Sequence, residues 1–149
     1  SNSYEHLEDG HTTEESKDRV LQVDKRARKI DTYLKNHFVA PQVYGNLEEA
    51  QIIFVTWGSS KGVVLDAQEK LSQTSKKSAL IHFTHVFPLK RETVVSLFEK
   101  KKKYVLVENN SQGQFGKLLR METGIDLQNM VLRYDGRPIT VEDVINKVV

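Results

Sequence analysis

From Gln51 onward, apolar residues gather in short runs that alternate with longer segments of mixed polarity. The runs are rich in β-branched residues, which is typical of strands buried on both faces. They predict strands at 52–56, 79–83, 104–108 and 130–134. The segments after them predict helices at about 60–73, 91–101, 112–123 and 141–148. This alternation requires a mostly parallel sheet between two layers of helices, a three-layer α/β/α arrangement with right-handed crossovers.

The first part of the chain has a different pattern. Residues 4–14 are polar and predict a loop, and 15–37 predict a long helix with Thr13 or Ser16 as its N-cap. Apolar residues recur on one face of this helix every three or four positions: Val20, Val23, Ala27, Ile30 and Leu34. We therefore expect a polar loop plus a long linker helix over 1–45, and an α/β domain over 46–149.

Composition limits the function classes. The chain has 149 residues and a net charge of +2, a smaller basic excess than nucleic-acid binders usually carry. It has no cysteine, so it cannot anchor an iron–sulfur cluster. No apolar run approaches the roughly 20 residues of a membrane span, and no apolar signal segment opens the chain. A cytoplasmic domain without nucleic-acid or membrane contact is the expectation.

The segment Trp57–Gly62 follows a predicted strand and opens a predicted helix. In a parallel sheet this is the carboxyl edge, where ligands usually bind, and free N–H groups at the helix start could hold an anion. The segment matches neither a Walker loop nor a GxGxxG fingerprint. On physical grounds, a tight turn with Ser60 as helix cap is the favoured explanation of this segment.

Two further segments lie at the same edge. Glu108–Gln114 offers several amides and one carboxylate to a ligand or a partner chain, or else its Asn and Ser side chains cap the next helix. Asp135–Pro138 has a turn composition, and Arg137 could pair with a carboxylate or phosphate.

No catalytic set or metal framework emerges from the remaining polar residues. The pair His82 and His85 lacks further ligands, and the cluster of Glu and His residues within 5–14 has no HExxH or Cys/His framework. The lysine run at 100–103 is a solvated helix end or a polyanion contact.

Several segments, taken in order, resemble the alpha subunits of 2-oxoacid:ferredoxin oxidoreductases. The segment 5–14 resembles an EHDExGH-type segment, 25–29 resembles the KRxRK stretch of the following helix, and 57–59 resembles a WGS turn. The other pieces in family order are His82-Phe83, Pro88, Val107–Asn110, Gly113-Gln114, Leu118–Arg120 and Tyr134–Pro138. The likeness extends from residue 4 to about residue 145.

The resemblance implies a fold like the transketolase C-terminal domain, with a five-stranded, mostly parallel sheet. The fifth strand would lie near 38–45 or 84–87, and one edge strand could be antiparallel. The resemblance also implies a reaction. Thiamine diphosphate attacks a 2-oxoacid, CO₂ leaves, CoA takes the acyl group, and electrons reach ferredoxin through iron–sulfur clusters. The relative that the motifs resemble most uses 2-oxoglutarate.

The resemblance further implies partners and a role. Thiamine diphosphate, magnesium and the clusters would belong to the parent complex, between the preceding alpha-chain domain and the beta subunit, and none would be bound by this chain. Alone it would be inactive, supporting the subunit interface and the edge near the active site or CoA entrance. The residues expected at this cofactor-facing edge are Trp57, Gly58, Glu108, Asn109, Asn110, Gln114 and Arg137.

A different hypothesis remains open. The chain could be a free-standing α/β regulatory module that binds an anion or a nucleotide through the Trp57–Gly62 turn.

Overall fold

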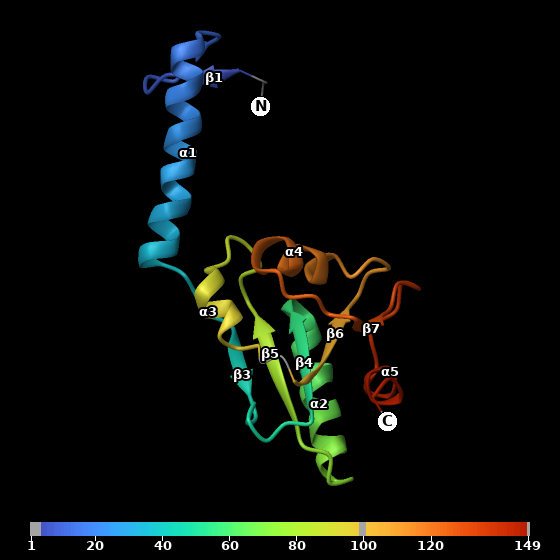
Figure 1. Ribbon diagram of the computed structural model, residues 1–149. Helices are drawn as coiled ribbons and strands as arrows, with labels where there is room; N and C mark the ends of the chain where they lie inside the picture. The colour runs from blue at the N-terminus through green and yellow to red at the C-terminus, as the bar shows by residue number, and fades with distance from the viewer. Residues whose placement is uncertain (1–3, 99–100, 149) are drawn as a thin grey trace. The chain divides into compact units, whose positions relative to one another are not determined.

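The computed structural model describes residues 4–98 and 101–148 (Figure 1). The chain divides into a first unit that ends at Phe38 and a second that begins at Val39. No helix in the described ranges is long and apolar enough to cross a membrane.

The first unit is a small hairpin followed by a long helix. Strands β1 (Glu5–His6) and β2 (Thr12–Thr13) pair antiparallel, so the predicted loop contains a short hairpin. Helix α1 (Ser16–Asn36) confirms the predicted long helix. The helix begins at Ser16, one of the two predicted starting residues, but the N-cap position belongs to Glu15. Thr13 is tied into the hairpin instead, where its Oγ1 accepts a hydrogen bond from the Glu15 backbone N–H (3.1 Å).

The second unit is built on one five-stranded sheet, which confirms the predicted architecture. Its strands are β3 (Gln42–Tyr44), β4 (Ile52–Trp57), β5 (Ser78–Phe83), β6 (Lys103–Glu108) and β7 (Asn129–Leu132). They lie in the order β3-β5-β4-β6-β7. Strand β3 runs antiparallel to β5, and the other pairs are parallel. The fifth strand is therefore the antiparallel edge strand within the first of the two predicted ranges.

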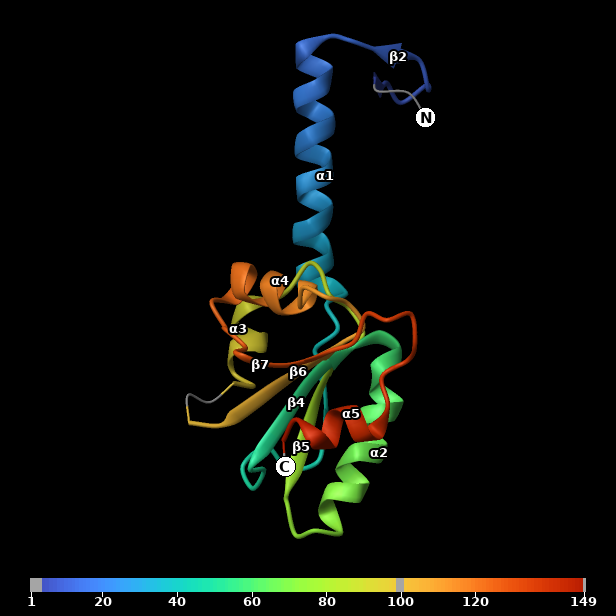
Figure 2. The same ribbon diagram turned by 90° about the vertical axis from the view of Figure 1, so that its right-hand side faces the viewer.

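Helices cover both faces of this sheet. The helical elements are η1 (Gly58–Ser60), α2 (Lys61–Ser72), α3 (Arg91–Val95), α4 (Gln114–Thr123) and α5 (Val141–Asn146). Helices α2 and α5 cover one face, and α3 and α4 cover the other (Figures 1 and 2). The three-layer α/β/α prediction is confirmed.

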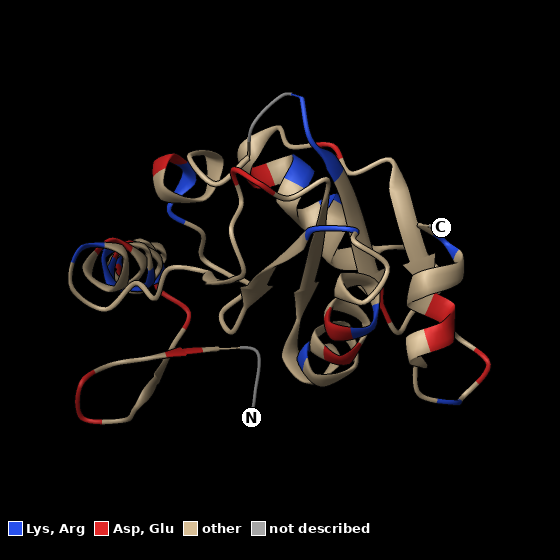
Figure 3. Cartoon of the chain, turned by 90° about the horizontal axis from the view of Figure 1, so that it is seen from below, with Lys and Arg blue, Asp and Glu red and all other residues tan. Residues whose placement is uncertain are grey.

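Alternate side chains of each strand enter the two halves of the core, as period-two geometry requires. Phe54, Leu80 and Val107 pack against α2 and α5. On the opposite face, Phe83 and Phe115 of α4 meet edge to face, with ring centroids 4.7 Å apart. Strands β4 and β5 contain no Lys, Arg, Asp or Glu, whereas α2 carries both signs of charge (Figure 3).

Helix α3 is shorter than the predicted 91–101. After Val95 the backbone N–H groups of Leu97 and Phe98 bond three residues back, which tightens the chain into a turn. The Phe98 ring then packs against Tyr104 of β6, with centroids 4.9 Å apart. Residues 99–100, near the end of the predicted helix and including the first of the lysine run, lie outside the described residues.

The strand order fixes where a ligand edge can form. Strand β4 lies between β5 and β6, and the chain leaves β4 toward β5 but leaves β6 toward β7. The loops after β4 and β6 therefore diverge, which creates a topological switch point at the carboxyl ends of these two strands. Trp57 ends β4 and Glu108 ends β6, so both residues lie at this point.

Candidate functional site

A buried carboxylate organises the switch point. Glu108 is 1% exposed. Its Oε1 accepts hydrogen bonds from Trp57 Nε1 (2.9 Å) and from the Phe115 backbone N–H (2.8 Å). Its Oε2 accepts a hydrogen bond from Asn110 Nδ2 (3.2 Å). Three donors therefore satisfy the buried charge, and the negative carboxylate lies at the positive N-terminus of α4.

The loop after β6 is mainly a helix cap. Asn110 Oδ1 accepts hydrogen bonds from the backbone N–H groups of Gln112 (3.0 Å) and Gln114 (3.3 Å). Gly113, the N-cap residue, has φ of 60°, a left-handed conformation that glycine adopts without strain. These hydrogen bonds support helix capping, which was one of the two interpretations of this segment. The other interpretation was contact with a ligand or a partner chain. The side chain of Gln114 is exposed at the first turn of α4.

The turn after β4 contacts the end of the neighbouring strand β5. Gly58 has φ of 59°, and its carbonyl oxygen lies 3.0 Å from His82 Nε2 at the end of β5. Ser60 occupies the N-cap position of α2, but its side chain makes no cap hydrogen bond there, so that part of the prediction is wrong. The reason is local: η1 continues directly into α2, and Ser60 already has helical backbone angles. Trp57 is 40% exposed, while its ring Nε1 donates to the buried Glu108 carboxylate.

A groove of about 550 Å³ lies beside this network. Three carboxyl-edge loops contribute to it, and its lining residues are Ser59, Asn109, Arg133, Tyr134, Gly136, Arg137 and Pro138. Asn109 Nδ2 donates to the Arg137 carbonyl oxygen (3.2 Å) and so ties the loop after β6 to the loop after β7. The Tyr134 ring is 73% exposed, and the Arg137 guanidinium makes no hydrogen bond or ion pair with the described residues.

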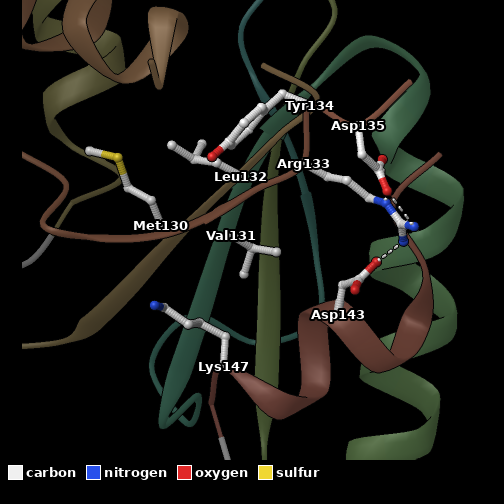
Figure 4. Close-up of a pocket in the computed structure, with 8 residues that line it drawn as sticks. All are labelled: Met130, Val131, Leu132, Arg133, Tyr134, Asp135, Asp143 and Lys147. Atoms are coloured by element: carbon white, nitrogen blue, oxygen red, sulfur yellow. Dashed lines mark hydrogen bonds and ion pairs between the residues drawn. The ribbon is translucent and has the colours of Figure 1, made fainter. Parts of the chain in front are cut away.

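The Arg133 guanidinium, in contrast to that of Arg137, forms ion pairs with two carboxylates. Its Nε lies 3.0 Å from Asp135 Oδ1, and its NH1 lies 2.5 Å from Asp143 Oδ2 (Figure 4). The pKa of Asp135 is lowered because Arg133 donates to its carboxylate, with a second contribution from the Arg137 backbone N–H. Arg133 thus joins the loop after β7 to α5, and it borders a neighbouring groove of about 590 Å³ along β7.

The structure sorts the predicted edge residues into two groups. Trp57, Glu108 and Asn110 form one hydrogen-bonded network, which Gly58 adjoins through the chain. Asn109 and Arg137 meet at the groove. Gln114 joins the first network only through its backbone N–H. Contact between any of these residues and a cofactor stays a prediction.

Sequence reasoning missed several participants. His82 and Phe115 support the network, and Arg133 and Tyr134 line the groove. The available signal was positional: Arg133 and Tyr134 end an apolar run, as Trp57 and Glu108 do, and the carboxyl ends of parallel strands meet at one edge.

Metal ligands do not gather at this edge within the part of the chain that the structure describes. The sequence has no cysteine to ligate an iron–sulfur cluster. In the described ranges, no three His, Cys, Asp or Glu side chains gather closely enough to hold a metal ion.

Comparisons with known proteins agree with the fold. The family profile of the transketolase C-terminal domain matches residues 44–121. The 2-oxoacid:ferredoxin oxidoreductase subunit alpha of Saccharolobus solfataricus is 34% identical over 142 residues, which cover 94% of this chain and 22% of that protein. The chain thus spans about a fifth of the length of the curated relatives it matches.

Solved structures extend the likeness. A 2-oxoglutarate:ferredoxin oxidoreductase from Magnetococcus marinus, with 2-oxoglutarate, coenzyme A and succinyl-CoA bound, matches 99% of this chain and 25% of its own. The TM-score is 0.79 and the identity 27%. The alpha chain of a "probable 2-oxoacid ferredoxin oxidoreductase" from Thermoplasma acidophilum is 32% identical, with a TM-score of 0.50, over 72% of this chain and 91% of its own. These findings confirm the resemblance seen in the motifs: the chain belongs to the alpha-subunit family of 2-oxoacid:ferredoxin oxidoreductases and contains a transketolase C-terminal domain.

Proposed function

We propose that this chain is the C-terminal domain of the alpha subunit of an enzyme that oxidatively decarboxylates 2-oxoglutarate to succinyl-CoA and reduces ferredoxin. The observation that carries the proposal is the likeness over 99% of the chain to a 2-oxoglutarate:ferredoxin oxidoreductase solved with 2-oxoglutarate, coenzyme A and succinyl-CoA. The choice of 2-oxoglutarate rests on that relative. A cytoplasmic location follows from the proposed role.

Within this enzyme the chain acts as a scaffold, and by itself it is inactive. Thiamine diphosphate, magnesium and iron–sulfur clusters belong to other parts of the complex: the sequence has no cysteine to ligate a cluster, and the described residues gather no three His, Cys, Asp or Glu side chains around a metal position. Its partners are the preceding domain of the alpha chain and the beta subunit, and through them ferredoxin and CoA.

The contribution of this chain is a fixed edge. Glu108 uses its carboxylate to lock the end of β4, the loop after β6 and the start of α4 together. The locked loops hold Asn109 against Arg137, which keeps the Arg137 segment in place beside the groove. Because the guanidinium of Arg137 has no partner among the described residues, it is free to pair with a phosphate of CoA.

The test replaces Arg137 by Gln in the complete complex. Loss of a charge-assisted contact raises the KM for CoA by about tenfold, which corresponds to about 1.4 kcal/mol. The KM for 2-oxoglutarate stays unchanged, because the substitution removes no contact to the oxoacid. Arg120→Gln is the control, since Arg120 is an exposed arginine at the far end of α4 that lies 3.5 Å from Asp126.

Two results would count against parts of this proposal. If the Arg137→Gln complex assembles and its KM for CoA is unchanged, Arg137 does not contact CoA. Failure of the complex to assemble assigns Arg137 to the subunit interface.

A further inference from the structure

Helix α1 exposes an apolar seam that nothing in its own unit covers. Val20 is 57% exposed, Val23 45% and Ile30 42%, and no residue of the helix is buried. Burial of these large apolar side chains against another surface would lower the free energy, because it removes apolar area from water. A contiguous apolar patch of this kind marks an interaction surface.

The spacing of the seam is that of a coiled coil. Its members follow each other at steps of three, four, three and four: Val20, Val23, Ala27, Ile30 and Leu34. In heptad terms, 20, 27 and 34 are a positions, and 23 and 30 are d positions. A seam with a period of 3.5 residues fits another helix that crosses at a shallow angle.

The flanking charges specify the direction of that helix. Arg19 and Arg26 occupy g positions, and Asp24 and Asp31 occupy e positions. In a parallel pair of identical helices, each g residue meets the e residue five positions later on the other copy, so both arginines face aspartates. In an antiparallel pair, g meets g and e meets e, which sets like charges against each other.

The hairpin of the same unit leaves the seam open. Glu5 pairs with Arg26 (2.7 Å) and Arg19 (3.4 Å), and the Gln22 side chain donates to the His6 carbonyl oxygen (3.2 Å). These contacts lie on one polar flank of α1. On the other flank, Asp24 and Asp31 make no ion pair with any described residue.

We infer that α1 packs in parallel against α1 of a second copy of this chain, through the seam Val20–Leu34. The charge complementarity of Arg19 with Asp24 and of Arg26 with Asp31 selects an identical partner in the same orientation. This inference is independent of the proposed function, because it uses only residues of the first unit.

An introduced thiol tests the geometry, since the chain has no cysteine of its own. In a parallel pair, position 20 faces position 20, and Val20→Cys forms a covalent dimer in a glutathione redox buffer. It does so at least about tenfold faster than Lys25→Cys on the opposite face, because a disulfide requires Cα atoms within about 7 Å. In an antiparallel pair an a position faces a d position, so Val20→Cys would not link to itself but to a cysteine at a d position such as Ile30→Cys, and that result overturns the parallel arrangement.

Sedimentation equilibrium of the full chain tests the seam. Ile30→Asp raises the dimer Kd by at least about 100-fold, because each dimer loses two buried side chains and gains two charges. The control Thr32→Asp places the same charge on the opposite face and leaves the Kd unchanged. A wild-type chain that stays monomeric up to about 1 mM overturns the inference and leaves the seam to a different partner.

Discussion

At the scale of single residues, Glu108 is the group on which the carboxyl edge depends. It is fully buried, and its two oxygens accept three hydrogen bonds from three different segments. A buried carboxylate is stable only when donors of this kind replace its hydration, so the loops must close around it in one arrangement. Glu108 therefore stabilises the edge through these three hydrogen bonds, and contact between its carboxylate and a ligand stays a prediction.

We expect Glu108→Gln to lower the free energy of unfolding by about 1–3 kcal/mol. The amide keeps the size of the side chain, but it brings an NH₂ group where three donors already converge. Asn110 cannot turn to accept from that NH₂ group without giving up the hydrogen bonds that its Oδ1 accepts from the backbone N–H groups of Gln112 and Gln114. Urea unfolding followed by Trp57 fluorescence measures the change.

The matched control for this change is Glu142→Gln. The Glu142 side chain is 65% exposed and pairs with Lys70 at 3.0 Å. We expect a loss below about 0.5 kcal/mol, as for most exposed ion pairs. Equal losses in the two variants would contradict the role assigned to Glu108.

At the scale of elements, close contact between α4 and the sheet depends on a glycine. A Cβ added to Gly116 would lie 2.6 Å from Leu106 Cδ2, in the buried interface. We expect Gly116→Ala to lower stability by about 1–3 kcal/mol through overpacking, despite the better helix propensity of alanine. Gly62→Ala in α2 is the control: a Cβ there meets nothing within 4 Å, and we expect stability to rise by up to about 1 kcal/mol. Thermal unfolding of both variants measures the difference, and a destabilised Gly62→Ala protein would contradict this account.

Helix α5 provides a prediction about pH. The pKa of Asp143 is lowered from its ordinary value of 3.8, because the backbone N–H and hydroxyl of Thr140 donate to its carboxylate and Arg133 lies beside it. A lowered folded-state pKa adds stability above the unfolded pKa, and this stability is lost as pH falls below about 4 toward the folded pKa. Asp143→Asn should therefore lower the Tm at pH 7, and the gap to wild type should narrow near pH 3. A gap that stays constant with pH would contradict the charge contribution.

The elements were predictable to different degrees. Strands β4 to β7 follow from short β-branched runs, and α5 follows from Thr140, whose capping box with Asp143 is present. Strand β3 was placed only within two candidate ranges, because it has three residues and none is fully buried. Helix α3 was predicted too long, because the apolar Leu97 and Phe98 continue a helical spacing while the Phe98 ring packs on Tyr104.

The site was predictable in position but not in its contacts. Residues that end parallel strands were expected to meet, and Trp57 and Glu108 do so. The contacts depend on which strands are neighbours in the sheet. This order decides that the Glu108 carboxylate is buried with three hydrogen-bond donors and that the Arg137 guanidinium has no partner among the described residues. The linear pattern does not contain that information, because β6 reaches β4 only after the chain has passed through β5.

At the scale of the whole molecule, the chain combines an α/β domain with a separate hairpin–helix unit. Its relatives are alpha subunits of which it spans about a fifth. The α/β domain offers an edge fixed by the hydrogen bonds of Glu108, and α1 offers an open seam. Both features suit a part that positions other parts of an assembly.

The most direct test purifies, under anaerobic conditions, the complex that contains this chain and assays viologen dye reduction with CoA and either 2-oxoglutarate or pyruvate. We predict CoA-dependent reduction with 2-oxoglutarate by the complex, and none by the isolated chain. Reduction with pyruvate alone would replace the substrate but keep the enzyme. The central claim would be contradicted if neither acid supported reduction while a cluster-bearing partner was present, and if Trp57 fluorescence of the isolated chain responded to CoA. That pair of results would favour a free-standing binding module.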